Sequence, residues 1–388
     1  MNGLSAQVEL LLFAHERPAA LEVAALRDWR LRSSLVTRRF QASRSTALEC
    51  RAGSVGLKGE ATAAARWQGE GDGPWRLRAA GRVVTLRGDW EVSDQGGNLR
   101  VKVRLPLEDY VAGVLPAEIT ADAPAAALAA QAVCVRSFTW RASRHPRHEA
   151  AWLCDATHCQ RFRGTLLPAR WVTRALAASA HVVRTWDGQP ALTVWHASCG
   201  GHGASAQAAF GGTAVPYLLG GRDTRPDGRA WCEGAPGPWR LTLPRDHAEA
   251  LWRSGGLLGP GESLVQLSVD AREPDGRVRT LRWAGHAPRV ALAREVWPRL
   301  GPTLPWPGWA SLRFDLNPTS EGWQFTGQGL GHGVGLCQAG ASARARSGWS
   351  FARILDAYFP GTRSAHWRLV RGQRSVVPSW ADEGPPGL

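Results

Sequence analysis

The residues that could do chemistry concentrate in a few short stretches, and the most distinctive is GLGHGVGLCQAGA, residues 329–341. Five glycines there surround His332, Cys337 and Gln338. Because glycine loses more conformational entropy on folding than any other residue, such a cluster indicates a backbone that needs positive φ or a close approach. Cys337 and His332 do not by themselves make a thiol nucleophile with its base, because a glycine-rich loop supplies no orienting third group.

A single glutamate ends an expected helix in the stretch PLEDYVAGVLPAEI, residues 106–119. Glu118 stands between Ala117 and Ile119, two residues after a proline. Such apolar neighbours would favour the protonated carboxyl, which is the form that a general acid needs. The alternative is a solvated glutamate at a helix end.

Four possible metal ligands fall within twelve residues in the stretch HEAAWLCDATHC. They are His148, Cys154, His158 and Cys159. Two nitrogens and two sulfurs with this spacing could close a tetrahedron around a structural zinc ion. A disulfide between the two cysteines and a pair of free thiols are the alternatives.

The stretch WHASCGGHGAS places a serine, a cysteine and two glycines after an expected strand. No G-x-S-x-G elbow surrounds Ser198, so the sequence does not favour a serine nucleophile. The adjacent Gly200 and Gly201 would let backbone amides approach a ligand. Cys199 could pair with Cys232.

The elements that would position these groups differ along the chain. Residues 1–100 alternate apolar and polar residues between glycine-rich turns, as antiparallel strands do. From Pro106 the pattern becomes helical and an alanine-rich segment follows at 123–144, so the two predict a helical hairpin with Glu118 at its turn. A further helix is expected across residues 167–180.

The rest of the chain completes a predicted α+β fold with a mixed β core. Strands are expected around the Asp187-Gly188 turn, followed by a β-rich insertion, abundant in proline, glycine and tryptophan, over residues 225–320. We therefore predict a β-rich N-terminal region at 1–100, a second domain at 101–365 that contains the insertion, and a flexible tail at 366–388.

Charge and hydropathy limit the class of protein. The formal net charge is +14, and only Lys58 and Lys102 are lysines, so the positive charge is arginine spread along the chain. No zinc-finger spacing, RNA-recognition signature or basic heptad array accompanies it, so nucleic acid is not favoured, and a polyanionic glycan would suit such a surface equally. The sequence has neither an apolar stretch long enough to span a membrane nor a signal-peptide pattern, so we expect no anchor and no export signal.

The motifs, taken in order, resemble the SpoIID/LytB family of bacterial cell-wall proteins, whose sporulation members are lytic transglycosylases. The matching segments are PLEDYVAGVLPAEI, AALAAQAVCVRSF, CDATHCQRFRG, HASCGGHGASAQAAFGG and GHGVGLCQAGA with the later AYFPGT. They span residues 105–362. The resemblance implies that 101–365 is the catalytic domain, that Glu118 is the catalytic acid and that the other motifs line the same groove.

The resemblance also implies a substrate, a cofactor and the residues that bind them. We expect cleavage between N-acetylmuramic acid and N-acetylglucosamine in peptidoglycan glycan strands stripped of their stem peptides, with a 1,6-anhydro end as the product. Zinc bound by a Cys/His site in some family members favours the zinc interpretation of residues 148–159. Arg136 would bind the lactyl carboxylates bidentately. The expected substrate contacts are Tyr110, Gln131, Arg136, Ser198, Gly200, Gly201, His332 and Gln338.

The family also includes proteins described as amidase enhancers. The alternative function is therefore a glycan-binding accessory protein that recruits or activates a cell-wall amidase without cutting the glycan. Either function implies an extracytoplasmic protein associated with the cell wall, although the N-terminal anchor of sporulation members is not visible in this sequence.

Overall fold

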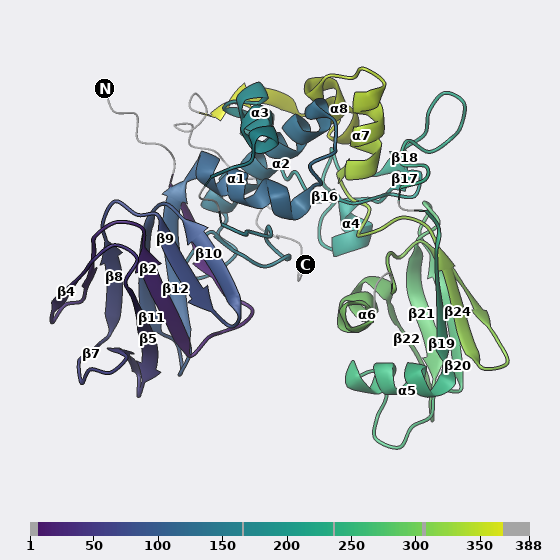
Figure 1. Ribbon diagram of the computed structural model, residues 1–388. Coiled ribbons are helices and arrows are strands. Elements are labelled where there is room, and N and C mark those ends of the chain that lie inside the picture. Colours follow the sequence, from purple (N-terminus) through teal and green to yellow (C-terminus); the bar gives the residue numbers. More distant parts are fainter. Residues whose placement is uncertain (1–6, 165–166, 236, 305–307, 368–388) are drawn as a thin grey trace. The chain divides into compact units, whose positions relative to one another are not determined.

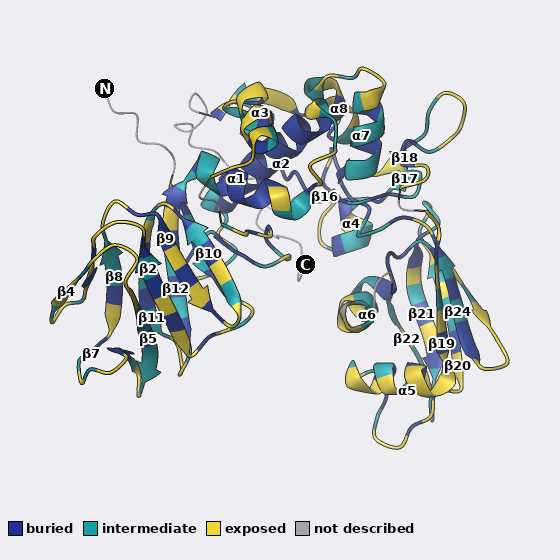
Figure 2. Cartoon of the chain, viewed as in Figure 1, coloured by how far each residue is buried: buried dark blue, intermediate teal, exposed yellow. Residues whose placement is uncertain are grey.

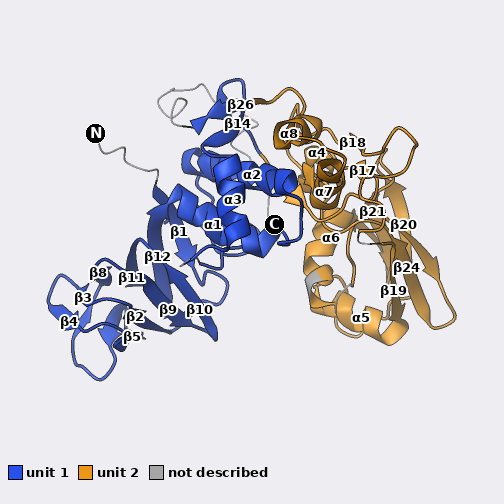
Figure 3. Ribbon diagram, turned by 45° about the horizontal axis from the view of Figure 1, so that its top comes forward, with its two compact units in different colours: residues 1–192, 364–375 blue, residues 193–363, 376–388 orange. Residues whose placement is uncertain are grey.

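The computed structural model of the protein describes residues 7–164, 167–235, 237–304 and 308–367 (Figure 1). The chain divides into two compact units (Figure 3). Unit 1 comprises residues 1–192 and 364–375, and unit 2 comprises residues 193–363 and 376–388.

The N-terminal part of unit 1 is a β-sandwich (Figure 1). One sheet has the strand order β13 (Leu153–Cys154), β1 (Gln7–Leu12), β12 (Leu99–Pro106), β11 (Asp89–Asp94), β8 (Arg66–Glu70), β3 (Trp29–Arg32) and β4 (Thr37–Phe40). The other has the order β10 (Arg82–Leu86), β9 (Trp75–Ala79), β2 (Ala20–Ala25), β5 (Ser45–Arg51), β6 (Ser54–Leu57) and β7 (Ala63–Ala64).

Tryptophans hold the two sheets of this sandwich together. The Trp67 indole, from one sheet, donates to the Val55 carbonyl of the other at 2.7 Å. Trp75 packs edge-on against both Trp29 and Trp90 of the opposite sheet. Alternate side chains of β1 and β12 are buried, as expected for strands with one face on a core. The predicted β-rich N-terminal region is therefore confirmed.

Helices follow the sandwich in unit 1. They are α1 (Leu107–Glu118), α2 (Ala125–Arg144) and α3 (Arg170–Ala178). The first two begin directly after Pro106 and Pro124, which are their N-cap residues and precede the intrahelical N–H donors. Most of α2 is buried (Figure 2), because its small alanine side chains let α1 and α3 pack closely. The structure thus contains the predicted hairpin, with Glu118 as the last residue of its first helix.

A small sheet completes the described part of unit 1. Its order is β15 (Gln189–Pro190), β14 (Val182–Trp186) and β26 (Arg363–His366), and β14 packs against α2. Asp187 and Gly188 both have positive φ, of 48° and 73°, which makes the predicted tight turn between β14 and β15.

Unit 2 consists of small sheets and short helices. Its strands are β16 (Trp195–His196) with β25 (Leu336–Cys337), β17 (His202–Gly203) with β18 (Gly221–Arg222), β19 (Trp239–Pro244) with β24 (Gly322–Gly327) and β23 (Phe314–Pro318), and β20 (Gln266–Arg272) with β21 (Val278–Ala284) and β22 (Pro288–Leu292). Its helical segments are α4 (Ala206–Phe210), α5 (Arg245–Ser254), α6 (Ala293–Leu300), η1 (Gly301–Thr303), α7 (Gln338–Arg346) and α8 (Phe351–Tyr358). Together with unit 1 they make a mixed α+β fold, as predicted.

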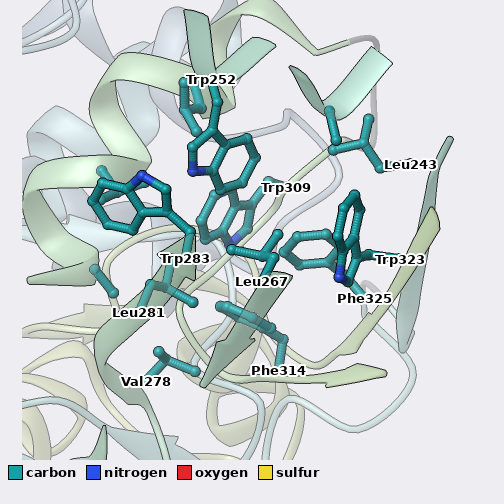
Figure 4. Close-up of a cluster of buried hydrophobic side chains, with 14 of the residues drawn as sticks. Leu243, Trp252, Leu267, Val278, Leu281, Trp283, Trp309, Phe314, Trp323 and Phe325 are labelled. Carbon is teal, nitrogen blue, oxygen red and sulfur yellow. The ribbon is translucent and has the colours of Figure 1, made fainter. Parts of the chain in front are cut away.

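The core of the β-rich part of unit 2 is aromatic (Figure 4). Trp252 of α5 and Trp283 of β21 are buried beside Trp309. Phe314 and Phe325 contact the Trp309 ring with centroids 5.3 Å away. This core gives the residues of the predicted insertion a hydrophobic centre of their own.

The predicted domain boundaries at residues 100 and 365 stay predictions. The chain crosses between the two units at 192/193, inside the domain predicted for 101–365. Of the predicted tail 366–388, His366 ends β26 and Trp367 is buried, while 368–388 lie outside the described residues. Among the described residues, no helix combines the length and the apolarity needed to cross a membrane.

Candidate functional site

Glu118 lies at the C-terminus of α1 and is held by a neighbouring loop. Its Oε1 accepts a hydrogen bond of 2.8 Å from the backbone N–H of Arg161. The side chain is half-buried, and the nearby Pro116 is exposed. The carboxylate therefore has a polar partner and access to solvent, rather than the apolar enclosure expected from the sequence.

The loop of residues 155–163 is packed tightly on α1. The ring of Phe162 stacks on Tyr110 with centroids 5.5 Å apart, and the N–H of Arg163 donates to the Gly113 carbonyl at 3.1 Å. A Cβ atom at Gly113 would lie 2.3 Å from the Phe162 ring. Glycine at this helical position is therefore required by the close approach of the loop.

The same loop is also fastened to α2 and to the sandwich. Gln160 is buried, and its amide donates to the Val135 carbonyl at 3.3 Å. Asp155 accepts hydrogen bonds from the backbone N–H groups of Phe13 and Ala14 and from the Arg82 guanidinium. These contacts fix both ends of the segment that presents the Arg161 amide to Glu118.

The four predicted metal ligands converge at the start of this loop, and we call them the loop cluster: His148, Cys154, His158 and Cys159. Their ligand atoms lie within 4.8 Å of one another, with the two cysteines buried and the two histidines half-buried. The two Nε2 atoms are 3.4 Å apart, and each lies 3.3 Å from a cysteine Sγ. Tetrahedral zinc would separate two nitrogens by roughly 3.3 Å and a nitrogen from a sulfur by roughly 3.6 Å. The donor set and its geometry therefore fit a zinc ion, and both cysteines are free thiols in the structure.

The expected substrate contacts of unit 1 are buried. Tyr110, Gln131 and Arg136 are all 0% exposed. Arg136 donates from Nε and Nη2 to the two carboxylate oxygens of Glu108 at 2.8 and 3.0 Å, and from Nη1 to the Ser179 carbonyl at 2.9 Å. Its guanidinium thus joins α1 to the end of α3. Arg136 was expected to bind lactyl carboxylates, whereas here its charge is paired with Glu108 inside the fold.

In unit 2 the glycines of the two motifs pack against each other. Gly200 and Gly329 have φ of 67° and 79°. A Cβ at Gly329 would lie 2.8 Å from the Ser198 carbonyl, and one at Gly200 would lie 3.1 Å from Gln328 and the Gly329 nitrogen. The backbones of Ser198 and Leu330 exchange hydrogen bonds of 3.1 and 2.8 Å. These glycines therefore serve a close approach between two chain segments.

The remaining residues of unit 2 that were predicted to contact substrate differ in how far they are buried. The hydroxyl of Ser198 is buried, Gly201 is half-buried with φ of 90°, and Gln338 is half-buried as the first residue of α7. His332 donates from Nε2 to the Trp195 carbonyl at 2.9 Å and accepts at Nδ1 from the Val334 N–H at 3.0 Å. Both ring nitrogens are thus used within the protein, so His332 offers only its ring surface, which lines a pocket of about 550 Å³.

Cys337 lies beside residues that are distant from it in the sequence. Its Sγ, the Sγ of Cys199 and a nitrogen of His196 lie within 4.8 Å of one another, and the Sγ of Cys232 is 3.6 Å from that of Cys199. We call these four residues the strand cluster, because His196 and Cys337 are paired on the parallel strands β16 and β25. His332 does not supply Cys337 with a base, since its nitrogens are engaged elsewhere.

Sequence reasoning missed the groups that hold Glu118. The donor is a backbone amide, which no residue type identifies. Gly113 offered a signal, because a glycine inside a predicted helix indicates close packing. His196 offered none, since a lone histidine at a strand end is typical of many structural positions.

Comparison with known proteins shows which sequences this chain resembles. Residues 95–186, which contain Glu118 and the loop cluster, match the model of the SpoIID family, described as stage II sporulation protein. An uncharacterised protein of Brachyspira hyodysenteriae is 29% identical over 69% of this chain and 68% of its own length. Stage II sporulation protein D of Bacillus subtilis is 24% identical over 67% of this chain and 74% of its own length. An amidase enhancer of Bacillus subtilis is 54% identical over 37 residues, which are 10% of this chain and 5% of that protein.

Proposed function

From the SpoIID family assignment, which the family model and the stage II sporulation protein D relative support, we propose that this protein acts on the glycan strands of bacterial peptidoglycan. We propose further that it is a lytic transglycosylase with Glu118 as its general acid and base. This function implies an extracytoplasmic protein at the cell wall.

The observation that carries this proposal is the isolation of Glu118 from the other carboxylates of its helix. Glu108 and Asp109 lie ten and nine residues earlier on α1, which corresponds to about 14 to 15 Å along the helix axis. The paired carboxylates of ordinary glycosidases are about 5 to 9.5 Å apart. Neither residue can therefore partner Glu118, and Glu108 is already bound by Arg136. A lytic cleavage needs one carboxylate.

The proposed reaction uses Glu118 twice. The carboxyl first protonates the glycosidic oxygen between N-acetylmuramic acid and N-acetylglucosamine, so that the bond to the anomeric carbon breaks. The resulting carboxylate then accepts the proton of the muramoyl 6-hydroxyl as that oxygen bonds to the same carbon. The product is a 1,6-anhydro end, and no water is consumed. The Arg161 amide would hold the carboxylate in position through both steps.

A zinc ion in the loop cluster would have a structural role. With four protein ligands the site has no open position for substrate, which is typical of structural zinc. The ion would fix His158 and Cys159, which directly precede the residues that hold Glu118.

Exposed Arg161 and Arg163 replace Arg136 as candidates for binding lactyl carboxylates, since their side chains flank Phe162 on the surface of the loop.

The test compares purified wild type and Glu118→Gln on intact and peptide-stripped peptidoglycan, with mass identification of the released fragments. We expect 1,6-anhydro products from wild type and a loss of at least about 100-fold for Glu118→Gln, the scale of general acid catalysis. Glu149→Gln, an exposed glutamate of the same unit, is the matched control and should retain activity. Reducing-end products would instead identify a hydrolase with a second catalytic group.

A double Arg161→Gln, Arg163→Gln variant should lose preference for the stripped glycan.

The alternative function is a glycan-binding accessory protein that enhances a cell-wall amidase. The 37-residue match to an amidase enhancer favours it. It predicts that wild type and Glu118→Gln both sediment with peptidoglycan, release nothing themselves and raise the rate of an added cell-wall amidase equally.

A further inference from the structure

The strand cluster is buried in unit 2 and is assembled from distant parts of the chain. His196 and Cys199 come from the first glycine motif, Cys337 from the second, and Cys232 from the segment between them. All four residues are no more than 4% exposed. The pairing of β16 with β25 aligns His196 with Cys337, which brings a nitrogen and a sulfur to the same point.

His196 has the hydrogen bonding of a metal ligand. Its Nδ1 lies 3.0 Å from the Val334 carbonyl, so this nitrogen carries the proton and donates it. The other nitrogen, Nε2, is therefore an unprotonated acceptor, and it is buried without a hydrogen-bond partner among the described residues. A backbone carbonyl that fixes the tautomer through one nitrogen, leaving the other for a metal, is a common arrangement in metal sites.

The sulfur of Cys337 accepts two backbone hydrogen bonds. It caps the N-terminus of α7, and its Sγ accepts the N–H of Gly340 at 3.4 Å and the N–H of Cys199 at 3.3 Å. Backbone donors at a helix N-terminus stabilise a negative sulfur. This observation is independent of His196, and the ligand atoms of both residues lie within 4.8 Å of the Cys199 sulfur.

A disulfide would explain the positions of only two of these four residues, whereas a metal ion would explain all four. The sulfurs of Cys199 and Cys232 are 3.6 Å apart, whereas a disulfide needs about 2.05 Å. Linking them would leave the Cys337 sulfur and the His196 nitrogen buried beside the bond with no function. Tetrahedral zinc would instead separate two sulfur ligands by roughly 3.8 Å.

We propose that His196, Cys199, Cys232 and Cys337 form a closed structural site for a thiophilic divalent cation, with Zn²⁺ as the ion such ligands select. Cys232 is the fourth ligand because it packs in the same buried group as the other two cysteines. The ion would join the two glycine-rich motifs to each other and to the segment around Cys232. This site is separate from the loop cluster and does not depend on the proposed glycan chemistry.

The test measures zinc per chain in the full-length protein purified with reductant and excess zinc. We expect two ions for wild type, one for Cys199→Ser with Cys337→Ser, and one for Cys154→Ser with Cys159→Ser. Cys50→Ser, a cysteine outside both clusters, is the matched control and should bind as wild type does. An unchanged zinc content in the Cys199 and Cys337 variant would overturn the proposal, whatever the loop cluster binds.

A second measurement keeps all three cysteines of the strand cluster. Co²⁺ replaces zinc in the variant that lacks Cys154 and Cys159, and thiolate-to-cobalt absorption with tetrahedral d–d bands is expected. His196→Gln should shift those d–d bands while thiolate absorption remains. Absence of both signals, or recovery of Cys199 and Cys232 as a disulfide-linked peptide pair from protein handled without reductant and loaded with zinc, would overturn the proposal.

Discussion

The two Cys/His groups of this protein are built in opposite ways. The loop cluster takes all its ligands from twelve consecutive residues, and its histidines are half-buried beside an exposed loop. The strand cluster is buried throughout, and its residues Cys199 and Cys337 are 138 positions apart. A local cluster can order one loop without forming a core, whereas a cluster of distant residues restrains the fold of a whole unit. The first would therefore govern activity and the second stability.

Removing the loop cluster should have the largest effect on activity. In Cys154→Ser with Cys159→Ser, the loop that carries Arg161 and Phe162 loses its metal anchor. Misplacing a catalytic group by about 1 Å can cost about 100-fold in rate, so we expect at least that loss of glycan cleavage. Unit 2 should melt unchanged, because it contains none of these residues. Differential scanning calorimetry beside the fragment assay would show both effects, and a joint loss of unit 2 would break the comparison.

Arg136 tests whether the hairpin of unit 1 has anchors independent of the loop cluster. Arg136→Met leaves the Ser179 carbonyl without its donor and Glu108 without its counter-charge. We expect a loss of about 3 kcal/mol in the free energy of unfolding, at the lower end for a buried pair because Glu108 is partly exposed. Arg66→Met, which removes an exposed ion pair with Glu91, should cost less than about 1 kcal/mol. Urea unfolding would give both values, and equal losses would contradict a structural role for Arg136.

A substitution at Gly113 distinguishes the effect of moving the loop from the effect of losing its metal. In Gly113→Ala the added methyl would meet the Phe162 ring, and overpacking of about 1 to 3 kcal/mol should exceed the gain in helix propensity of about 1 kcal/mol. We expect a smaller loss of activity than in the cysteine variant, with zinc content unchanged. Phe162→Leu introduced into the same chain should restore part of the lost stability, because the smaller side chain leaves room for the methyl.

These differences explain what the sequence could and could not predict. The alternation of residues in β1 and β12 and the proline at the start of each hairpin helix are local signals, and the structure contains the elements they predict. The loop cluster was visible for the same reason, since its ligands lie within one stretch. Cys337 could not be joined to His196 beforehand, because only the pairing of β16 with β25 brings them together.

Two side chains that were expected to contact substrate bond within the protein instead, for a shared physical reason. Arg136 and His332 are polar residues in motifs, and the sequence does not reveal whether such a residue faces a ligand or its own fold. In both cases the neighbouring backbone decides the matter, because carbonyl groups of other segments accept their hydrogen bonds. Conversely, Glu118 accepts a hydrogen bond from a backbone amide whose position depends on the packing of Phe162.

The smallest predicted effect concerns a part of unit 2 outside both clusters. Glu262 accepts hydrogen bonds from the Arg289 guanidinium at 2.8 Å and from the Gly259 N–H at 2.6 Å. These bonds, with that of Arg289 the larger cause, lower the pKa of Glu262 from 4.5 to about 2. Its contribution to stability is therefore full above pH 4.5 and is lost as pH falls toward 2, because the unfolded chain takes up the proton first.

Glu262→Gln should accordingly lower the melting temperature of unit 2 at neutral pH and have little effect near pH 2. Asp315→Asn, in which the carboxylate is 76% exposed and pairs with Arg272, should change the melting temperature less at any pH. Because Glu262 touches neither cluster, zinc content and glycan cleavage should match wild type at neutral pH. A pH-independent effect of Glu262→Gln would mean that the side chain acts through packing rather than charge. A loss of zinc in that variant would mean that the strand cluster depends on the β-rich part of unit 2. The two clusters would then differ only in how deeply they are buried.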